Sequence, residues 1–125
     1  MTLTLLFRIQ AVVMAFFGVG MLFAAGALIE SFGISATENP MMPTIMQQLS
    51  ILPLPFAYFS WKAPDWVGSN LKAVGMFSAV VHFAFIVVGL YQHTNGAFPL
   101  DSFAQAAQNL GPDVILGILF LWKSR

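Results

Sequence analysis

The sequence has no cysteine and few charged residues, and each absence excludes a class of protein. Without cysteine there is no disulfide framework, no thiolate metal site and no cysteine nucleophile. Only 8% of the 125 residues are charged, whereas a soluble domain carries about 25%. Five Lys and Arg balance five Asp and Glu, so the basic footprint of a nucleic-acid-binding protein is missing. An ordinary soluble fold and nucleic-acid binding are therefore not expected.

Long apolar segments dominate what is present, since 58% of the residues are apolar. A membrane-spanning helix needs roughly 20 such residues, and helices satisfy their backbone polar groups within lipid. Charged residues divide the chain into four segments of this kind, at 9–29, 41–61, 73–91 and 103–122. The sequence predicts an all-α integral membrane protein, a single domain over residues 1–125 formed by a bundle of four transmembrane helices.

The first segment also contains Ala25-Gly26-Ala27, which resembles the cleavage site of a signal peptide. Its apolar run is longer than that of a usual signal peptide, and no positive residue precedes Arg8. We therefore expect this segment to be retained as a membrane helix.

The positive residues predict the orientation. With four spans, both termini and the middle loop at 62–72 share one side of the membrane. All five positive residues fall on that side, namely Arg8, Lys62, Lys72, Lys123 and Arg125, and so do Trp61, Trp66 and Trp122. The positive-inside rule places this side in the cytoplasm or stroma, with the tryptophans as an interfacial belt. We expect a bacterial inner membrane or a thylakoid or other organelle membrane.

Two of the predicted spans contain helix-breaking residues. Pro53 and Pro55 predict a kink near residues 51–55 of the second span. Gly111-Pro112 interrupts the fourth span, which is then either one kinked helix over 103–122 or two pieces that meet near Pro112. We favour the single helix, because the piece after Pro112 is too short to cross a bilayer alone.

The third span is expected to pack through one face of small residues. Residues on steps of three, four or seven share a helical face, and small side chains let membrane helices approach closely. The residues on this face are Gly75, Ser78, Ala79, His82 and Gly89. The first span has a similar face at Ala11, Ala15, Gly18 and Ala25. His93 falls in the outer loop that follows the third span, where Asn95-Gly96 predicts a turn.

His82 and Asp113 are the titratable residues deep within the spans. Each lies ten residues from a lysine of the inner boundary, Lys72 and Lys123 respectively, and so about 15 Å into the membrane. Because consecutive antiparallel helices usually pack together, we expect the two residues to meet as a midplane polar pair. Ionisable residues at this depth usually pair with one another and mark functional sites. We therefore treat His82 and Asp113 as the candidate functional pair.

Three roles for this pair remain open. A hydrogen bond between the two side chains could clasp two helices, the pair could relay protons or bind a substrate, or His82 could ligate a cofactor. The cofactor would be a haem or a chlorophyll-type pigment, with Ser78 and Ala79 leaving room for a flat macrocycle. No metal site of the zinc type is expected, since one histidine and one carboxylate are too few. No catalytic constellation is expected either.

The N-terminal third resembles small four-helix bacterial membrane proteins of the DoxX-like kind. The matching residues are Phe7-Arg8-Ile9, Phe17-Gly18-Val19-Gly20, Glu30 and Gly33-Ile34, and the rest agrees in span number and loop size. The resemblance implies the four-helix fold and carries no catalytic residue with it.

The predicted function is that of a small non-enzymatic accessory subunit of a larger membrane complex. An energy-transducing or photosynthetic complex with pigment contacts would suit this composition. The expected partners are the lipid bilayer, with bound lipid, and other membrane subunits. The alternative is a stand-alone transporter or membrane enzyme that uses His82 and Asp113.

Overall fold

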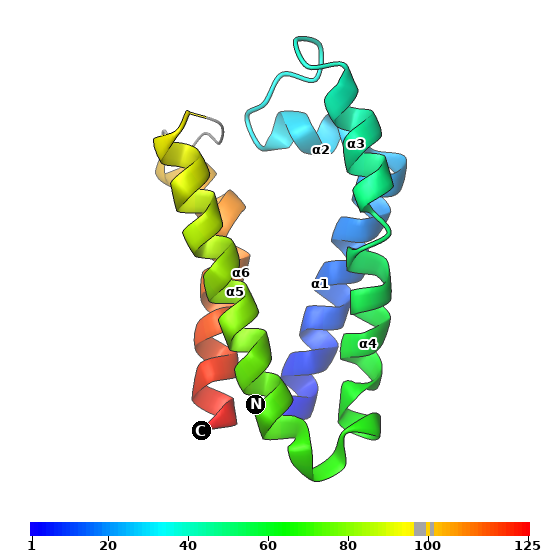
Figure 1. Cartoon of the computed structure of the whole chain (residues 1–125), viewed down its shortest axis with the longest axis vertical. Helices are drawn as coiled ribbons and strands as arrows, with labels where there is room; N and C mark the ends of the chain where they lie inside the picture. Colours follow the sequence, from blue (N-terminus) through cyan, green and yellow to red (C-terminus); the bar gives the residue numbers. More distant parts are fainter. Residues whose placement is uncertain (97–99, 101) are drawn as a thin grey trace. The chain divides into compact units, whose positions relative to one another are not determined.

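The computed structural model describes residues 1–96, 100 and 102–125, and every regular element in these ranges is helical (Figure 1). The elements are α1 (Leu3–Phe23), α2 (Ala25–Ser31), α3 (Met41–Leu49), α4 (Pro53–Trp66), the 3₁₀ turn η1 (Gly68–Asn70), α5 (Leu71–Thr94) and α6 (Phe103–Ser124). The predicted all-α class is therefore confirmed. Two helical stretches, Leu3–Phe23 and Gly68–Thr94, are long and apolar enough to cross a membrane.

The chain forms two compact units. Unit 1 consists of residues 1–7 and 63–125, and unit 2 consists of residues 8–62. The boundary falls within α1 and again within α4. Each unit is described by itself below.

The prediction of one helix over 9–29 is wrong. Helix α1 begins earlier, at Leu3, and ends at Phe23, and α2 runs across its direction (Figure 1). Ala24 lies between them with non-helical angles (φ −135°, ψ 34°), although its N–H still donates to the Gly20 carbonyl at 2.8 Å. The side-chain amide of Gln47 donates to the carbonyl oxygen of Leu22 at 3.3 Å. This bond gives a partner to a carbonyl at the bend.

The predicted kink in the second span is a complete break between α3 and α4. Proline is favoured in the first turn of a helix because its missing N–H is not needed there. Pro53 and Pro55 therefore open α4 instead of bending a longer helix. The hydroxyl of Ser50 donates to the Gln47 carbonyl at 2.6 Å and so helps to close the end of α3.

The connections on either side of α5 are shorter than predicted. Helix α4 extends to Trp66, so the expected loop at 62–72 contracts to residues 67–70, with η1 inside it. Helix α5 covers more than the predicted 73–91, and its last turn contains His93, which was expected in a loop. The turn at Asn95-Gly96 is confirmed, with Gly96 at φ 71°. The loop expected between the third and fourth spans includes residues 97–99 and 101, which lie outside the described residues.

The fourth segment is one continuous helix, as the favoured alternative predicted. Helix α6 begins after Ser102, whose hydroxyl accepts a hydrogen bond from the Gln105 N–H at 3.2 Å. Such a cap replaces a bond that the first helical turn cannot make by itself. The helix then continues through Gly111-Pro112 to Ser124, so a proline within its length does not divide it.

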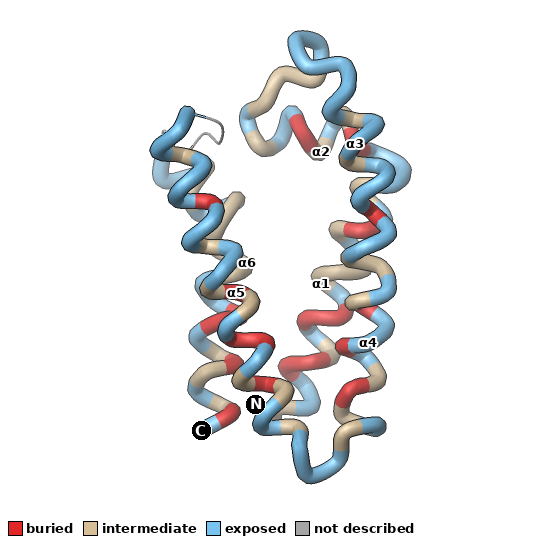
Figure 2. Tube along the Cα trace, viewed as in Figure 1, coloured by how far each residue is buried: buried red, intermediate tan, exposed pale blue. Residues whose placement is uncertain are grey.

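The core of unit 1 lies where α5 packs along α6 (Figure 2). The buried residues of α5 are Gly75, Ser78, Ala79, His82 and Gly89, which confirms the predicted small-residue face. Its apolar cluster consists of Leu6, Phe7, Ala63, Ala79, Leu116 and Phe120. The rings of Phe7 and Phe120 form a T-shaped pair, with their centroids 4.9 Å apart. Small residues on α5 thus leave space that larger side chains of α6 and the first turns of α1 fill.

Unit 2 packs through the small residues of α1. Ala11 and Gly18 of α1 are buried and Ala15 is half-buried, whereas the buried Ala25 of the predicted face belongs to α2. A Cβ atom added to Gly18 would lie 2.6 Å from the side chain of Leu54 and 3.3 Å from its backbone nitrogen. Gly18 therefore permits a close approach of α1 to the start of α4.

Candidate functional site

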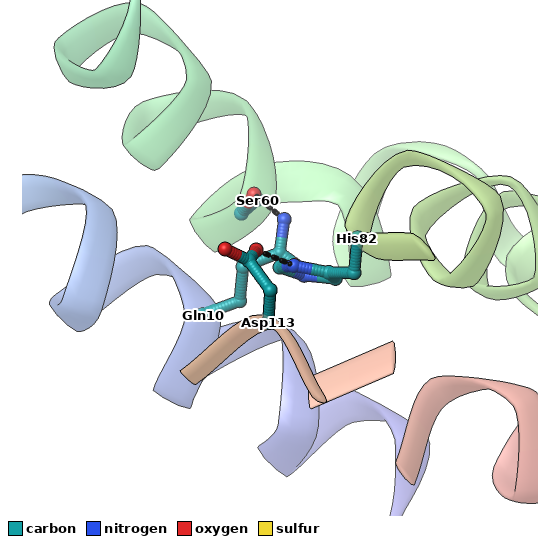
Figure 3. Close-up of polar contacts among 4 residues, drawn as sticks. All are labelled: Gln10, Ser60, His82 and Asp113. Carbon is teal, nitrogen blue, oxygen red and sulfur yellow. Dashed lines mark hydrogen bonds and ion pairs between the residues drawn. The ribbon is translucent and has the colours of Figure 1, made fainter. Parts of the chain in front are cut away.

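The structure brings His82 of α5 and Asp113 of α6 together in unit 1. Their side chains point toward one another, and His82 Nδ1 lies 2.7 Å from Asp113 Oδ1 (Figure 3). The His82 side chain is 2% exposed and that of Asp113 is 24% exposed. The distance is short for a hydrogen bond between nitrogen and oxygen, as is typical when one partner is charged.

The chemistry of the two groups sets the direction of this bond. An ionised carboxylate accepts hydrogen bonds and cannot donate them, so with Asp113 ionised the proton lies on His82 Nδ1. A carboxylate on one ring nitrogen fixes the orientation and tautomer of the imidazole and leaves the lone pair on Nε2. The arrangement is therefore able to hold two helices together or to hold a proton between two titratable groups.

Aromatic and small residues surround the imidazole. The ring of Phe120 stacks on it, with centroids 5.9 Å apart and planes 17° from parallel. A Cβ atom added to Gly117 would lie 3.3 Å from His82 Cβ, which makes Gly117 the point of close approach between α5 and α6. Ala79 is buried in the apolar cluster, and the Ser78 hydroxyl donates to the Val74 carbonyl at 3.1 Å. Protein side chains thus occupy the face of α5 on which a flat macrocycle was expected to fit beside Ser78 and Ala79. This packing does not favour a haem or chlorophyll on His82.

Gln105, Asn109 and Asp113 are spaced by four residues along α6, and of these three the described hydrogen bonds join only Asp113 to His82. Gln105, Asn109 and Asp113 are all half-buried on α6. Gln105 and Asn109 make interactions of their own. His93, which was expected in a loop, is half-buried and also interacts with other groups. The pair at the centre of the candidate site is therefore His82 with Asp113.

A second buried polar pair, in unit 2, was not predicted. The side-chain amide of Gln10 on α1 donates to the hydroxyl of Ser60 on α4 at 3.1 Å, and neither residue is exposed (Figure 3). Within the described ranges, the amide oxygen of Gln10 has no hydrogen-bond partner. Near this pair, the guanidinium of Arg8 lies 4.3 Å from the centroid of the Trp61 ring. Gln10 is the one polar residue between Arg8 and Glu30, so the sequence did contain a signal for this contact.

In the part of the chain that the structure describes, the pair of His82 and Asp113 does not extend into a larger cluster of metal-ligating side chains. Among the described residues, no group of three or more His, Asp or Glu side chains lies close enough together to hold a metal ion.

Comparisons with known proteins add no family to this description. No family model, curated protein or solved structure matches the chain. The DoxX-like resemblance of the N-terminal third therefore stays a prediction.

Proposed function

We propose that the chain is a small multi-pass membrane protein that serves as a non-enzymatic subunit of a larger membrane complex. The observation that carries this proposal is the exposed apolar surface of α1 and α5. Only 28% of the apolar stretch of α1 and 28% of that of α5 is buried within the chain. An unpartnered apolar surface of this kind must be covered by lipid or by another protein. The proposal supplies both.

In the proposed arrangement, the spans are α1, the α3–α4 pair, α5 and α6. Both termini and the connection at 67–70 lie on the cytoplasmic or stromal side, as the distribution of Lys and Arg favours. The proposal therefore comprises both the four-helix membrane bundle and the role of a subunit.

The topology can be tested with single cysteines, because the chain contains none. A membrane-impermeant thiol reagent added outside intact cells should label a Glu38→Cys variant. It should label Ser69→Cys and Arg125→Cys variants only after the membrane is permeabilised. Labelling of Glu38→Cys and Arg125→Cys from the same side would contradict the arrangement.

Membership of a complex is tested by mild detergent extraction followed by native mass analysis. The expected result is a species that contains further subunits, such as those of an energy-transducing or photosynthetic complex. A protein that migrates alone in every mild detergent would count against the subunit role.

The bond between His82 and Asp113 favours one alternative, a stand-alone transporter or membrane enzyme. A titratable pair whose histidine is almost fully buried has the composition of a proton-handling site. In that case His82→Ala and Asp113→Asn variants should abolish activity and still insert at normal levels. Variants that retain full function would leave the pair with the role of a clasp between helices.

A further inference from the structure

We infer that the basic end of unit 1 binds the headgroup of an anionic phospholipid, with an acyl chain along α6. The inference rests on the proposed membrane location. It concerns the end of α5 and α6 where Lys72, Lys123 and Arg125 lie. These residues are distinct from the His82–Asp113 pair.

The first observation is a contact that gathers positive charge. The ammonium of Lys72, in the first turn of α5, donates to the main-chain oxygen of Arg125, the last residue of the sequence, at 2.7 Å. The ammonium of Lys72 is therefore held at the end of α6, the segment that also carries Lys123 and Arg125. In the described part of unit 1 the side-chain carboxylates are Asp113, which binds His82, and Asp65 on α4, so the three cations Lys72, Lys123 and Arg125 leave this end positive even when an α-carboxylate on Arg125 is counted. A phosphate diester with one negative charge complements such a basic end.

The second observation is an apolar strip that leads to these charges. Ile115, Ile118 and Trp122 are exposed and spaced by three and four residues, so they share one face of α6. Trp122 is 64% exposed, and the ammonium of Lys123 lies 3.9 Å from the centroid of its ring. Indole rings favour the depth of lipid headgroups. The order of apolar strip, indole and cations along α6 matches that of acyl chain, ester region and phosphate in a phospholipid.

The test uses the full chain in a neutral detergent and measures binding of short-chain phosphatidylglycerol and phosphatidylcholine by native mass spectrometry. Phosphatidylglycerol should bind more tightly. Lys72→Gln and Lys123→Gln variants should each weaken its binding about fivefold, which corresponds to about 1 kcal/mol per cation. Lys72→Arg keeps the charge and should retain the preference. Lys62→Gln, in unit 2, removes the same charge and should leave binding unchanged.

Three results would overturn the inference. Equal binding of the two lipids would remove the role of the headgroup charge. An equal loss in the Lys62→Gln variant would show a diffuse charge effect without a site. Displacement of the lipid by millimolar inorganic phosphate would assign a free anion in place of a lipid. Carbonate extraction of membranes separates the two proposals, because release of the wild-type chain would refute the membrane location itself, whereas retention without lipid preference would refute the inference alone.

Discussion

At the scale of single residues, the bond between His82 and Asp113 should contribute a measurable but small part of the stability. Hydrogen bonds between membrane helices average about 0.6 kcal/mol and reach about 1.7 kcal/mol. The 2.7 Å distance places this bond toward the upper end of that range. A double-mutant cycle with His82→Leu and Asp113→Leu, followed by unfolding in mixed micelles, should give a coupling of about 1–2 kcal/mol. A coupling near zero would mean that the two side chains stabilise the fold independently.

The pair of Gln10 and Ser60 should respond asymmetrically to mutation. Ser60→Ala removes the partner of a fully buried amide and leaves the whole amide unsatisfied, which costs about 1–3 kcal/mol. Gln10→Leu removes the amide together with its unpaired oxygen, so its cost should be smaller. Free energies of unfolding for the two variants provide the measurement. A larger loss for Gln10→Leu than for Ser60→Ala would show that the amide oxygen has a partner in solution.

At the scale of helices, Gly18 controls how closely α1 approaches α4. A Gly18→Ala variant brings a methyl group within 2.6 Å of Leu54, and overpacking of this kind typically costs about 1–3 kcal/mol. Gly26→Ala, in α2, is the matched control, since nothing lies within 4 Å of its added Cβ. Alanine in a helix is favoured over glycine by about 1 kcal/mol, so the control should be neutral or more stable. Equal thermal stabilities of the two variants would refute close packing at Gly18.

The bend after α1 is bridged by a long-range hydrogen bond and should weaken without it. Gln47→Ala removes the side-chain donor to the Leu22 carbonyl, and we expect a loss of about 0.6–1.7 kcal/mol. Gln48→Ala deletes the neighbouring amide and serves as the control, with an expected change within about 0.5 kcal/mol. Amide hydrogen exchange of residues 22–28 should accelerate only in the Gln47→Ala variant. Similar exchange in both variants would argue that the bend forms without this bond.

The sequence predicts those features that depend on residue type and spacing. The small face of α5 follows from residues three, four or seven apart, and the approach of His82 to Asp113 follows from counting inward from two lysines. The bend at Ala24 has no such local signal, because alanine favours helix and the Leu22 carbonyl is satisfied by a residue 25 positions away. Pro53 was predicted to kink a helix, but whether a proline kinks a helix or starts one depends on its position relative to the first helical turn. Charged residues show where apolar segments begin and end, but a helix can continue past a charged residue. Helix α4 accordingly extends past Lys62.

At the scale of the whole molecule, a membrane location makes charge on the exposed face of α5 costly in proportion to depth. Val80, near the middle of α5, is 59% exposed, and Tyr91, near its end, is 67% exposed. A lysine at the centre of a membrane helix costs about 2.5–3.5 kcal/mol of insertion free energy. Val80→Lys should therefore reduce the membrane-inserted fraction, and Tyr91→Lys should leave it near wild type. In a soluble chain both exposed substitutions would be harmless, so equal behaviour in a glycosylation-reporter insertion assay would contradict the proposal.

The length of α1 also has a consequence for bilayer thickness. Its 21 residues rise about 32 Å, close to the hydrocarbon thickness of about 30 Å. A helix continued without interruption to Ser31 would measure about 43 Å and would have to tilt steeply to hide its apolar length. In the proposed membrane arrangement, the bend at Ala24 therefore lets α1 stand nearly upright in an average bilayer. Hydrophobic mismatch, and with it the sorting among membranes of different thickness that the proposal implies, is then set by where a single alanine leaves the helical conformation.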